Sequence, residues 1–158
     1  MIEVYDDFFD EDIHKEIFDR LIEPHWGISG GDSNKPEIFW HYDGLEEEEY
    51  FNTFLFEKIC KKLGRSFKYL RIYANGQTAG QCGTPHIDEG DLTFLYYPSP
   101  VWELKFQGHL IFAEQERMIE YVSNRAVLFD AKLPHYADAP HRWFNGLRIS
   151  LAYKLLKK

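Results

Sequence analysis

The feature that most constrains the fold is a change of pattern at Gly64. After this residue the sequence divides into short runs rich in β-branched and aromatic residues, and Gly, Pro, Asn and Asp separate these runs. Regularly spaced runs of this kind favour strands and are typical of an antiparallel barrel or sandwich. The predicted strands cover 67–74, 91–98, 108–114, 118–123, 126–131 and 147–155.

The first part of the chain has a different periodicity, because its apolar residues recur at helical spacing. Ile13, Ile17 and Leu21 follow the acidic stretch 10–12. Negative charge at this point stabilises a helix N-terminus, and the spacing places the apolar residues on one face. We therefore predict an amphipathic helix over about 11–22.

A second helix is predicted from the run of glutamates at 46–49 to the residue before Gly64. An apolar stripe follows the glutamates, and glycine commonly ends a helix. The length of the chain suits one hydrophobic core. We therefore expect a single domain over 1–158, with a helical cap over 1–66 packed outside a β core over 67–158.

The charge balance limits the partners of the protein. The chain has 18 Lys and Arg residues against 26 Asp and Glu residues, a formal net charge of −8. A nucleic-acid surface needs clustered positive charge, so nucleic acid is disfavoured as a partner. Residues 1–7 do not resemble a signal peptide, and no stretch approaches the roughly 20 apolar residues that span a bilayer. Cys60 and Cys82 have no CxxC spacing, which favours thiols in a reducing compartment. We expect a soluble, cytoplasmic protein with no membrane contact.

The second half of the chain holds residue types that bind a metal ion. In Pro85-His86-Ile87-Asp88, the side chains of His86 and Asp88 share a face if the chain is extended. Two imidazoles and one carboxylate form the Fe(II) site of non-haem oxygenases, so a second histidine is needed. His135 follows the predicted strand 126–131 and is our choice. His141, in the polar loop beyond it, is the alternative.

An arginine near the C-terminus is placed to bind an organic acid. Arg148 and Ser150 share a face of the predicted strand 147–155. Arginine binds a carboxylate through paired, charge-assisted hydrogen bonds, which suits the far end of a dicarboxylate. Arg142 is the alternative, but no predicted strand fixes its direction. Tyr97 and Tyr73 add hydroxyl groups that could assist.

These residues resemble those of the Fe(II)/2-oxoglutarate-dependent dioxygenases, and within them the prolyl-hydroxylase-like group. The resemblance covers 67–155, and Val4-Tyr5-Asp6-Asp7-Phe8-Phe9 is also similar to the start of the helical cap in that group. It implies a mainly β fold, a double-stranded β-helix (a jelly-roll or cupin-like barrel) packed against N-terminal helices. Metal ligands His86, Asp88 and His135 and co-substrate ligands Arg148, Ser150, Tyr97 and Tyr73 are implied.

The resemblance also implies the reaction and its cofactors. The expected enzyme binds Fe(II), uses 2-oxoglutarate and O₂ as co-substrates with ascorbate as an accessory, and releases succinate and CO₂. Its expected product is a hydroxylated prolyl or similar residue in a peptide or protein. Two departures from the family pattern are Gln107-Gly108, where Gly-Gly is common, and a long interval between His135 and Arg148.

The substrate and the mobile loops are less strongly specified. The segments 25–45 and 75–85 combine Gly, Pro and aromatic residues, and each could serve as a lid. One alternative is the same chemistry on a free amino acid or small metabolite. Another is a non-catalytic, cupin-like metal-binding module, which would not need the Arg148-x-Ser150 pair. The residues predicted to form the substrate rim are Trp40, Tyr42, His141 and Arg142.

Overall fold

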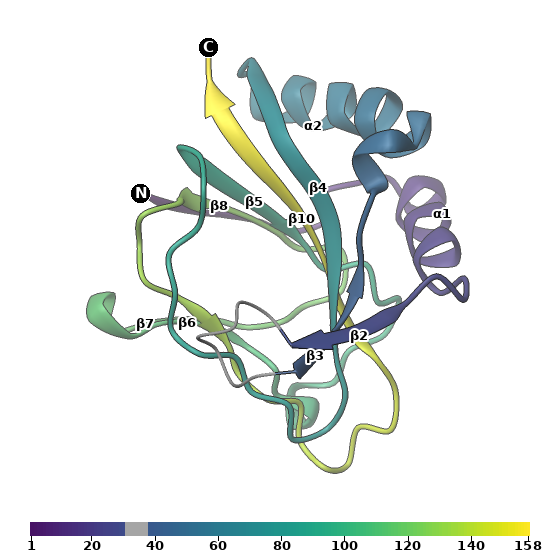
Figure 1. Cartoon of the computed structure of the whole chain (residues 1–158), viewed down its shortest axis with the longest axis vertical. Helices are drawn as coiled ribbons and strands as arrows, with labels where there is room; N and C mark the ends of the chain where they lie inside the picture. Colours follow the sequence, from purple (N-terminus) through teal and green to yellow (C-terminus); the bar gives the residue numbers. More distant parts are fainter. Residues whose placement is uncertain (31–37) are drawn as a thin grey trace.

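Two antiparallel sheets face each other, and the helices cover the outer face of the larger one (Figure 1). The computed structural model describes residues 1–30 and 38–158. Every strand pair of this part is antiparallel. This arrangement confirms the predicted mainly β, jelly-roll-like fold packed against helices.

The larger sheet has seven strands and carries most of the structure. In spatial order its strands are β1 (Ile2–Tyr5), β8 (Ala126–Asp130), β5 (Leu92–Tyr96), β10 (Arg148–Lys157), β4 (Phe67–Gln77), β3 (Ile38–Tyr42) and β2 (Gly27–Gly30). The smaller sheet has the order β7 (Arg117–Ile119), β6 (Leu110–Phe112) and β9 (Tyr136–Ala137). Short 3₁₀ turns lie at Leu45–Glu47, Leu104–Phe106 and Ala113–Gln115.

The central strands are apolar on both faces because both faces are covered. In β5, Phe94 and Tyr96 pack into the cluster beneath the helices, whereas Leu95 packs with Tyr97 into the cluster between the sheets. Side chains alternate between the faces of a strand, so a strand between two layers needs apolar residues at successive positions. The larger sheet is therefore the middle layer of the molecule.

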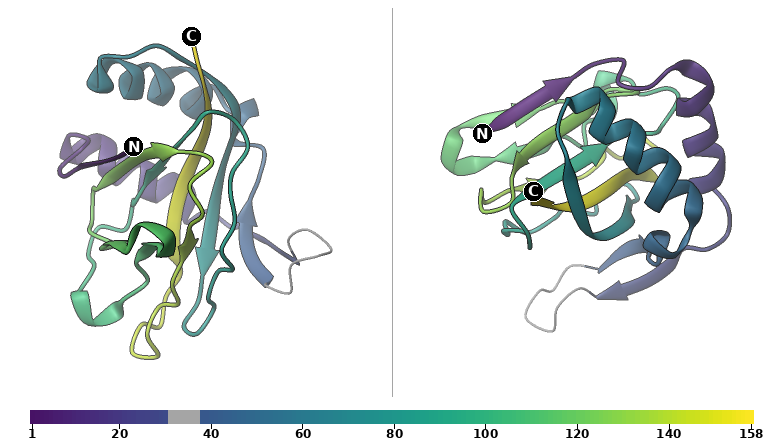
Figure 2. Two further views of the ribbon diagram at one scale, coloured as in Figure 1. Left: turned by 90° about the vertical axis from the view of Figure 1, so that its left-hand side faces the viewer. Right: turned by 90° about the horizontal axis from the view of Figure 1, so that it is seen from above.

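The helices pack on the side of the larger sheet away from β6 and β7 (Figures 1 and 2). Helix α1 (Glu11–Leu21) buries Ile17 and Leu21 completely. The second predicted helix is divided: Tyr50–Leu55 is a π-helix, and α2 follows over Phe56–Leu63. It ends at Gly64, whose φ of 62° is a left-handed conformation that glycine adopts without strain.

The first 66 residues contain the expected helices but also contribute β1, β2 and β3 to the larger sheet. These strands are short, and they are defined by their pairing: β1 with β8, β3 with β4, and β2 with β3. The predicted loop 75–85 begins later than expected, because β4 continues to Gln77 alongside β10. In the predicted lid 25–45, β2 and β3 pair with each other, and residues 31–37 lie outside the described part.

Within the described part of the chain, the helices are too short or too polar to traverse a bilayer.

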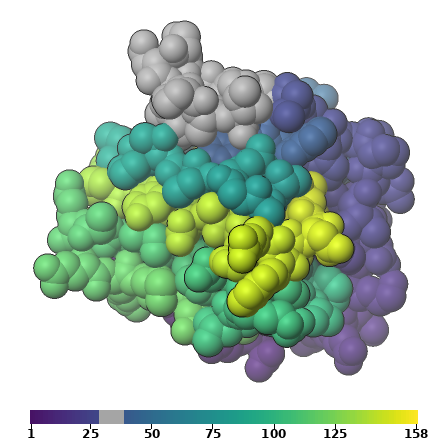
Figure 3. Space-filling view, turned by 90° about the horizontal axis from the view of Figure 1, so that it is seen from below, coloured from purple at the N-terminus to yellow at the C-terminus, as the bar shows by residue number. Residues whose placement is uncertain are grey.

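Loops form the end of the molecule below the strands β4 and β10 (Figure 1). The segment after β4 lies against the later part of the chain (Figure 3). Backbone hydrogen bonds join Gly80 N to Pro140 O at 3.0 Å and Gly83 N to Ala137 O at 2.8 Å. These bonds hold the loop that leads to His86.

Candidate metal and co-substrate site

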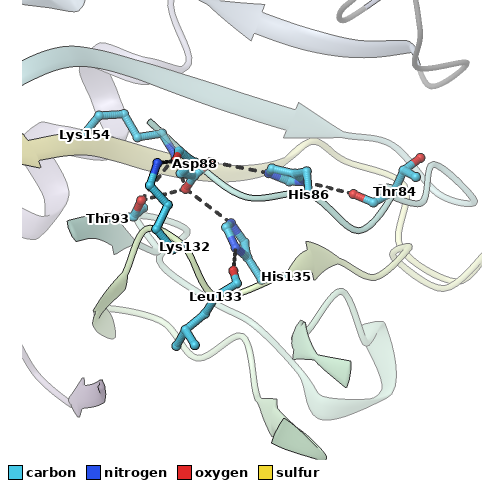
Figure 4. Close-up of polar contacts among 8 residues, drawn as sticks. All are labelled: Thr84, His86, Asp88, Thr93, Lys132, Leu133, His135 and Lys154. Carbon is cyan, nitrogen blue, oxygen red and sulfur yellow. Dashed lines mark hydrogen bonds and ion pairs between the residues drawn. The ribbon is translucent and has the colours of Figure 1, made fainter. Parts of the chain in front are cut away.

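The side chains of His86, Asp88 and His135 converge between the two sheets (Figure 4). One ligand atom from each lies within 4.8 Å of the others. The Nε2 atom of His86 is 3.5 Å from Asp88 Oδ1, and the Nε2 atom of His135 is 3.3 Å from Asp88 Oδ2. Two imidazole nitrogens and a carboxylate in this arrangement can hold one divalent metal ion.

The backbone fixes the two histidines relative to each other. His86 N donates to His135 O at 3.0 Å, and His135 N donates to His86 O at 2.9 Å. Each ring also bonds through Nδ1 to a nearby carbonyl, of Thr84 or Leu133, at 2.8 Å. A proton on Nδ1 leaves the Nε2 lone pair available for a metal. His86 therefore lies in an isolated bridge with His135, whereas the sequence suggested a regular strand that holds His86 and Asp88.

Asp88 is buried and receives several polar contacts. Thr93 Oγ1 donates to Asp88 Oδ2 at 2.6 Å, and Lys154 Nζ forms an ion pair with the same oxygen. Lys132 Nζ bonds to the backbone oxygen of Asp88 at 2.9 Å. Burial alone would raise the pKa of Asp88, but the contacts with His135, His86 and Lys154 lower it well below its usual range. The carboxylate is therefore ionised at neutral pH, the form in which it can bind a metal ion.

Arg148 lies at the other side of the same cavity and is 2% exposed. Its Nε donates to Gly108 O at 2.6 Å, and Nη1 donates to Gln77 Oε1 at 2.9 Å. Its guanidinium is 4.8 Å from the ring centre of Tyr121 and 5.6 Å from that of Tyr97. No carboxylate in the described residues forms a salt bridge with Arg148. A buried guanidinium without an anion is suited to bind one.

Three residues with hydroxyl groups lie in or beside this cavity. Ser150 and Tyr73 line the cavity, and Tyr97 is fully buried beside Arg148. The Tyr97 hydroxyl is buried with no hydrogen-bond partner in the described structure. Burial raises the pKa of both Tyr73 and Tyr97, so each hydroxyl keeps its proton at neutral pH. An orphaned donor beside an unpaired guanidinium fits the carboxylate of a dicarboxylic co-substrate.

Two of the four residues predicted to form the substrate rim, Trp40 and Tyr42, do not line the cavity that contains Arg148 and His86. Tyr42 is 8% exposed and packs against His25 and Trp26 in the cluster beneath the helices. Trp40 projects to the same face of β3 as Tyr42, because residues two apart in a strand share a face. On the other face of β3, Phe39 lines a hollow next to His86, and His41 bonds to Asn75, which lines the cavity.

The other two predicted rim residues, His141 and Arg142, lie in the loop after β9, outside the cavity that contains His86, Asp88 and His135. The ring of His141 contacts that of Trp143, with centroids 4.4 Å apart, and Arg142 is exposed. Neither lines the cavity that contains Arg148 and the metal-binding cluster. The structure therefore favours His135 and Arg148 over His141 and Arg142 for the two roles.

Several residues of the site were absent from the sequence prediction. Lys154 and Thr93 contact Asp88, Gln77 contacts Arg148, and Asn75 lines the cavity. A signal existed for Lys154, because alternation along the predicted strand 147–155 places it on the face of Arg148 and Ser150. The others depend on which strands pair, and the sequence does not specify pairing.

Solved structures with the same fold are numerous, although no protein-family model matches the sequence and no curated protein matches it. A Burkholderia pseudomallei oxidoreductase of the 2OG-Fe(II) oxygenase family aligns with a TM-score of 0.76 and 11% identity, over 98% of this chain and 84% of its own. A prolyl hydroxylase from Trichoplax adhaerens, bound to a hypoxia-inducible-factor peptide fragment, aligns with a TM-score of 0.73 and 12% identity, over 98% and 82%. HygX from Streptomyces hygroscopicus, with nickel, 2-oxoglutarate and hygromycin B bound, aligns with a TM-score of 0.68 and 12% identity, over 96% and 81%. The chain thus has the fold of the 2-oxoglutarate- and Fe(II)-dependent oxygenases, with prolyl hydroxylases among its structural neighbours.

Proposed function

We propose that this protein is an Fe(II)- and 2-oxoglutarate-dependent dioxygenase that hydroxylates a prolyl or similar residue in a peptide and releases succinate and CO₂. One observation carries the proposal. The metal-binding cluster of His86, Asp88 and His135 shares a cavity with Arg148, whose buried charge has no carboxylate partner in the described structure. A non-catalytic metal-binding module would not need the second feature.

One group of residues would bind the metal ion, and another would bind the co-substrate. His86, Asp88 and His135 would hold Fe(II) and leave its remaining positions open; bound iron supplies the oxidising chemistry with O₂. Arg148 would bind the distal carboxylate of 2-oxoglutarate, with hydrogen bonds from Ser150 and Tyr97. The stacked rings of Tyr97 and Tyr121, 4.2 Å apart, exclude water behind Arg148 and strengthen this contact.

A second hollow next to the metal-binding cluster supports a peptide rather than a free amino acid as substrate. It has a volume of about 60 Å³, shares His86, Asn75, Ala137 and Ser150 with the first cavity, and is otherwise walled by Phe39, Gln77 and Gly83. Among the described residues that line it, none carries a formal charge when His86 is neutral. Burying the ammonium and carboxylate of a free amino acid without partners is costly, whereas a residue within a peptide has neither charge. A neighbouring fold with bound hygromycin B keeps a small-molecule substrate as the alternative.

The metal site is tested by exchanging the two candidate histidines. We expect His135→Ala to abolish stoichiometric Fe(II) binding, because Asp88 and His86 alone form an incomplete ligand set. His141→Ala should leave most of the binding, since its ring lies in the outer loop. Anaerobic calorimetric titration with Fe(II) measures both. The reverse result would transfer the third ligand to His141.

The co-substrate site is tested by exchanging the two arginines. A charge-assisted hydrogen bond contributes roughly 1.5–3 kcal/mol, so Arg148→Ala should weaken 2-oxoglutarate binding by about one to two orders of magnitude. Arg142→Ala should have little effect, because Arg142 is exposed outside the cavity. The measurement is a 2-oxoglutarate titration of the anaerobic Fe(II) protein. A large effect only in Arg142→Ala would refute the assigned role of Arg148.

The substrate class is tested by mass spectrometry. Fe(II), 2-oxoglutarate and O₂ are supplied with a panel of proline-containing peptides, and the products are examined for a gain of one oxygen on proline. Succinate formation on each peptide serves as the parallel readout. Oxidation of a free amino acid or metabolite, with no activity on any peptide, would establish the small-molecule alternative.

A further inference from the structure

Lys154 is a buried lysine beside the metal-binding cluster, and neither metal ligation nor the Arg148 contact accounts for it. Its side chain is 5% exposed, and Nζ pairs with Asp88 Oδ2 and lies 3.4 Å from Thr93 Oγ1. It lines the same cavity as Arg148 and projects from the same face of β10. The metal-binding cluster therefore lies between two buried cations.

We propose that Lys154 balances charge at this site, making binding of the divalent metal weaker and binding of the dicarboxylate co-substrate tighter. The inference rests on the proposed function, because it assumes that both ligands bind here. Lys154 is then a positioning residue. It acts through its ion pair with Asp88 and through the electrostatic potential in the cavity, and it does not contact a reacting atom.

The contacts around Asp88 separate orientation from charge. Thr93 Oγ1 bonds to the carboxylate at 2.6 Å, and Asp88 N donates to Ala131 O at 2.8 Å. These two bonds orient the side chain and its backbone, and Lys154 adds a longer hydrogen bond to Thr93 Oγ1. What Lys154 alone contributes is a full positive charge in a cavity that excludes most water, where charges interact more strongly than at the surface.

That charge acts in opposite directions on the two ligands. A metal ion bound to Asp88 shares the carboxylate with Lys154, and two cations on one anion repel each other. The co-substrate carries two negative charges, and Arg148 neutralises only one of them. Lys154 attracts the same dianion and so favours its binding to the metal-loaded protein.

A contribution to folding is a weaker explanation for the pair. Bringing a lysine and an aspartate into the interior removes both from water, and this loss often cancels their mutual attraction. An apolar pair would fill the same space without that loss. The burial of Lys154 is better explained by a demand of the site, because Asp88 must remain charged as a metal ligand.

The central test replaces the charge while retaining a hydrogen-bond donor. In Lys154→Gln, Fe(II) should bind on the order of tenfold more tightly and 2-oxoglutarate on the order of tenfold more weakly, each about 1.4 kcal/mol. Lys154→Arg, which keeps the charge, should restore both values toward those of the native protein. Anaerobic calorimetry with Fe(II), followed by 2-oxoglutarate on the Fe(II)-loaded protein, measures both affinities. Lys154→Met is the second neutral variant if Lys154→Gln does not fold.

Two matched variants separate charge from position. Lys132→Gln removes an exposed lysine that bonds to the Asp88 backbone, and water screens that charge, so both affinities should change less than about threefold. Thr93→Val removes the hydrogen bond that orients Asp88 but removes no charge. It should weaken Fe(II) binding by about tenfold or more.

The outcomes distinguish this inference from the proposed function. Opposite changes in the two affinities support the role of Lys154. Parallel losses of both affinities would show a merely structural role, and unchanged affinities would show no role; either result overturns the inference. If the native protein itself binds Fe(II) but not 2-oxoglutarate, the proposed function fails instead.

Discussion

The two faces of the larger sheet differ in what their side chains do, although they belong to the same strands. In β10, Ile149, Leu151 and Tyr153 enter the apolar cluster beneath the helices. Arg148 and Lys154 alternate with them and face the metal-binding cluster. The helix-covered face therefore contributes the larger apolar cluster, whereas the opposite face carries the candidate site beside a smaller apolar cluster. Substitutions can be sorted by which face they reach.

The largest expected effect is a loss of stability on removal of a large side chain from the helix-covered face. Phe51 is completely buried there, so Phe51→Ala should lower the free energy of unfolding by about 3–5 kcal/mol. Phe54, in the same π-helical turn but 41% exposed, provides the control, and Phe54→Ala should lower it by much less. Chemical denaturation measures both. Metal affinity of the folded Phe51→Ala protein should be unchanged, and a marked loss would show that the two faces are coupled.

An intermediate effect is expected on the site face at Gly108. A Cβ atom there would lie 2.9 Å from Arg148 Cδ and 3.0 Å from Nε, and the residue has a φ of 75°. Gly108→Ala should therefore displace the Arg148 side chain. This should weaken 2-oxoglutarate binding by about tenfold and leave the Fe(II) affinity unchanged. Gly80 has a similar φ of 84° but no atom within 4 Å of an added Cβ. If Gly80→Ala weakens 2-oxoglutarate equally, backbone strain rather than the contact with Arg148 is responsible.

The smallest expected effect is the contribution of His14, on the helix-covered side, to the pH dependence of the free energy of unfolding. His14 in α1 bonds to the Tyr96 hydroxyl at 2.6 Å and to Ser123 Oγ at 3.1 Å. Burial lowers the pKa of His14, so the folded protein favours the neutral ring while the unfolded chain takes up a proton below about 6.5. Stability should fall as the pH drops through this range.

The His14→Gln variant isolates this contribution from those of the other histidines. Because solvent screens part of the effect, the variant should reduce the loss of unfolding free energy between about pH 7.5 and 5.5 by less than about 1 kcal/mol. Denaturation curves at the two pH values give the difference. An identical pH dependence in the native protein and the variant would contradict the assignment to His14.

The parts of the site that were predictable depend on short-range patterns. His86 and Asp88 lie in one tripeptide, and Arg148 with Ser150 in another, so alternation alone pairs their side chains. The fold class followed from the regular spacing of strand-like runs after Gly64. Lys154 could have been predicted in the same way, because it continues the same alternation along β10.

The missed parts depend on pairing between distant strands. Whether Phe39 and His41 or their neighbours Trp40 and Tyr42 face the site is set by the register of β3 on β4, in which Trp40 lies opposite Gly76. A shift by one residue would exchange the two sets, and no local pattern fixes that choice. The aromatic character of Trp40 and Tyr42 suits a substrate rim and a hydrophobic core equally well.

The reciprocal backbone bonds between His86 and His135 have a consequence for metal exchange. Because these bonds and the Thr93 contact are made within the protein and do not depend on the metal, we expect one ion to replace another without refolding of the chain. A rigid set of two nitrogens and one oxygen does not by itself select iron, since Ni²⁺, Cu²⁺ and Zn²⁺ generally bind such sites more tightly than Fe²⁺. The ion found in the isolated protein would then record which metal was abundant where it was made, and catalytic competence would depend on iron supply as much as on the fold.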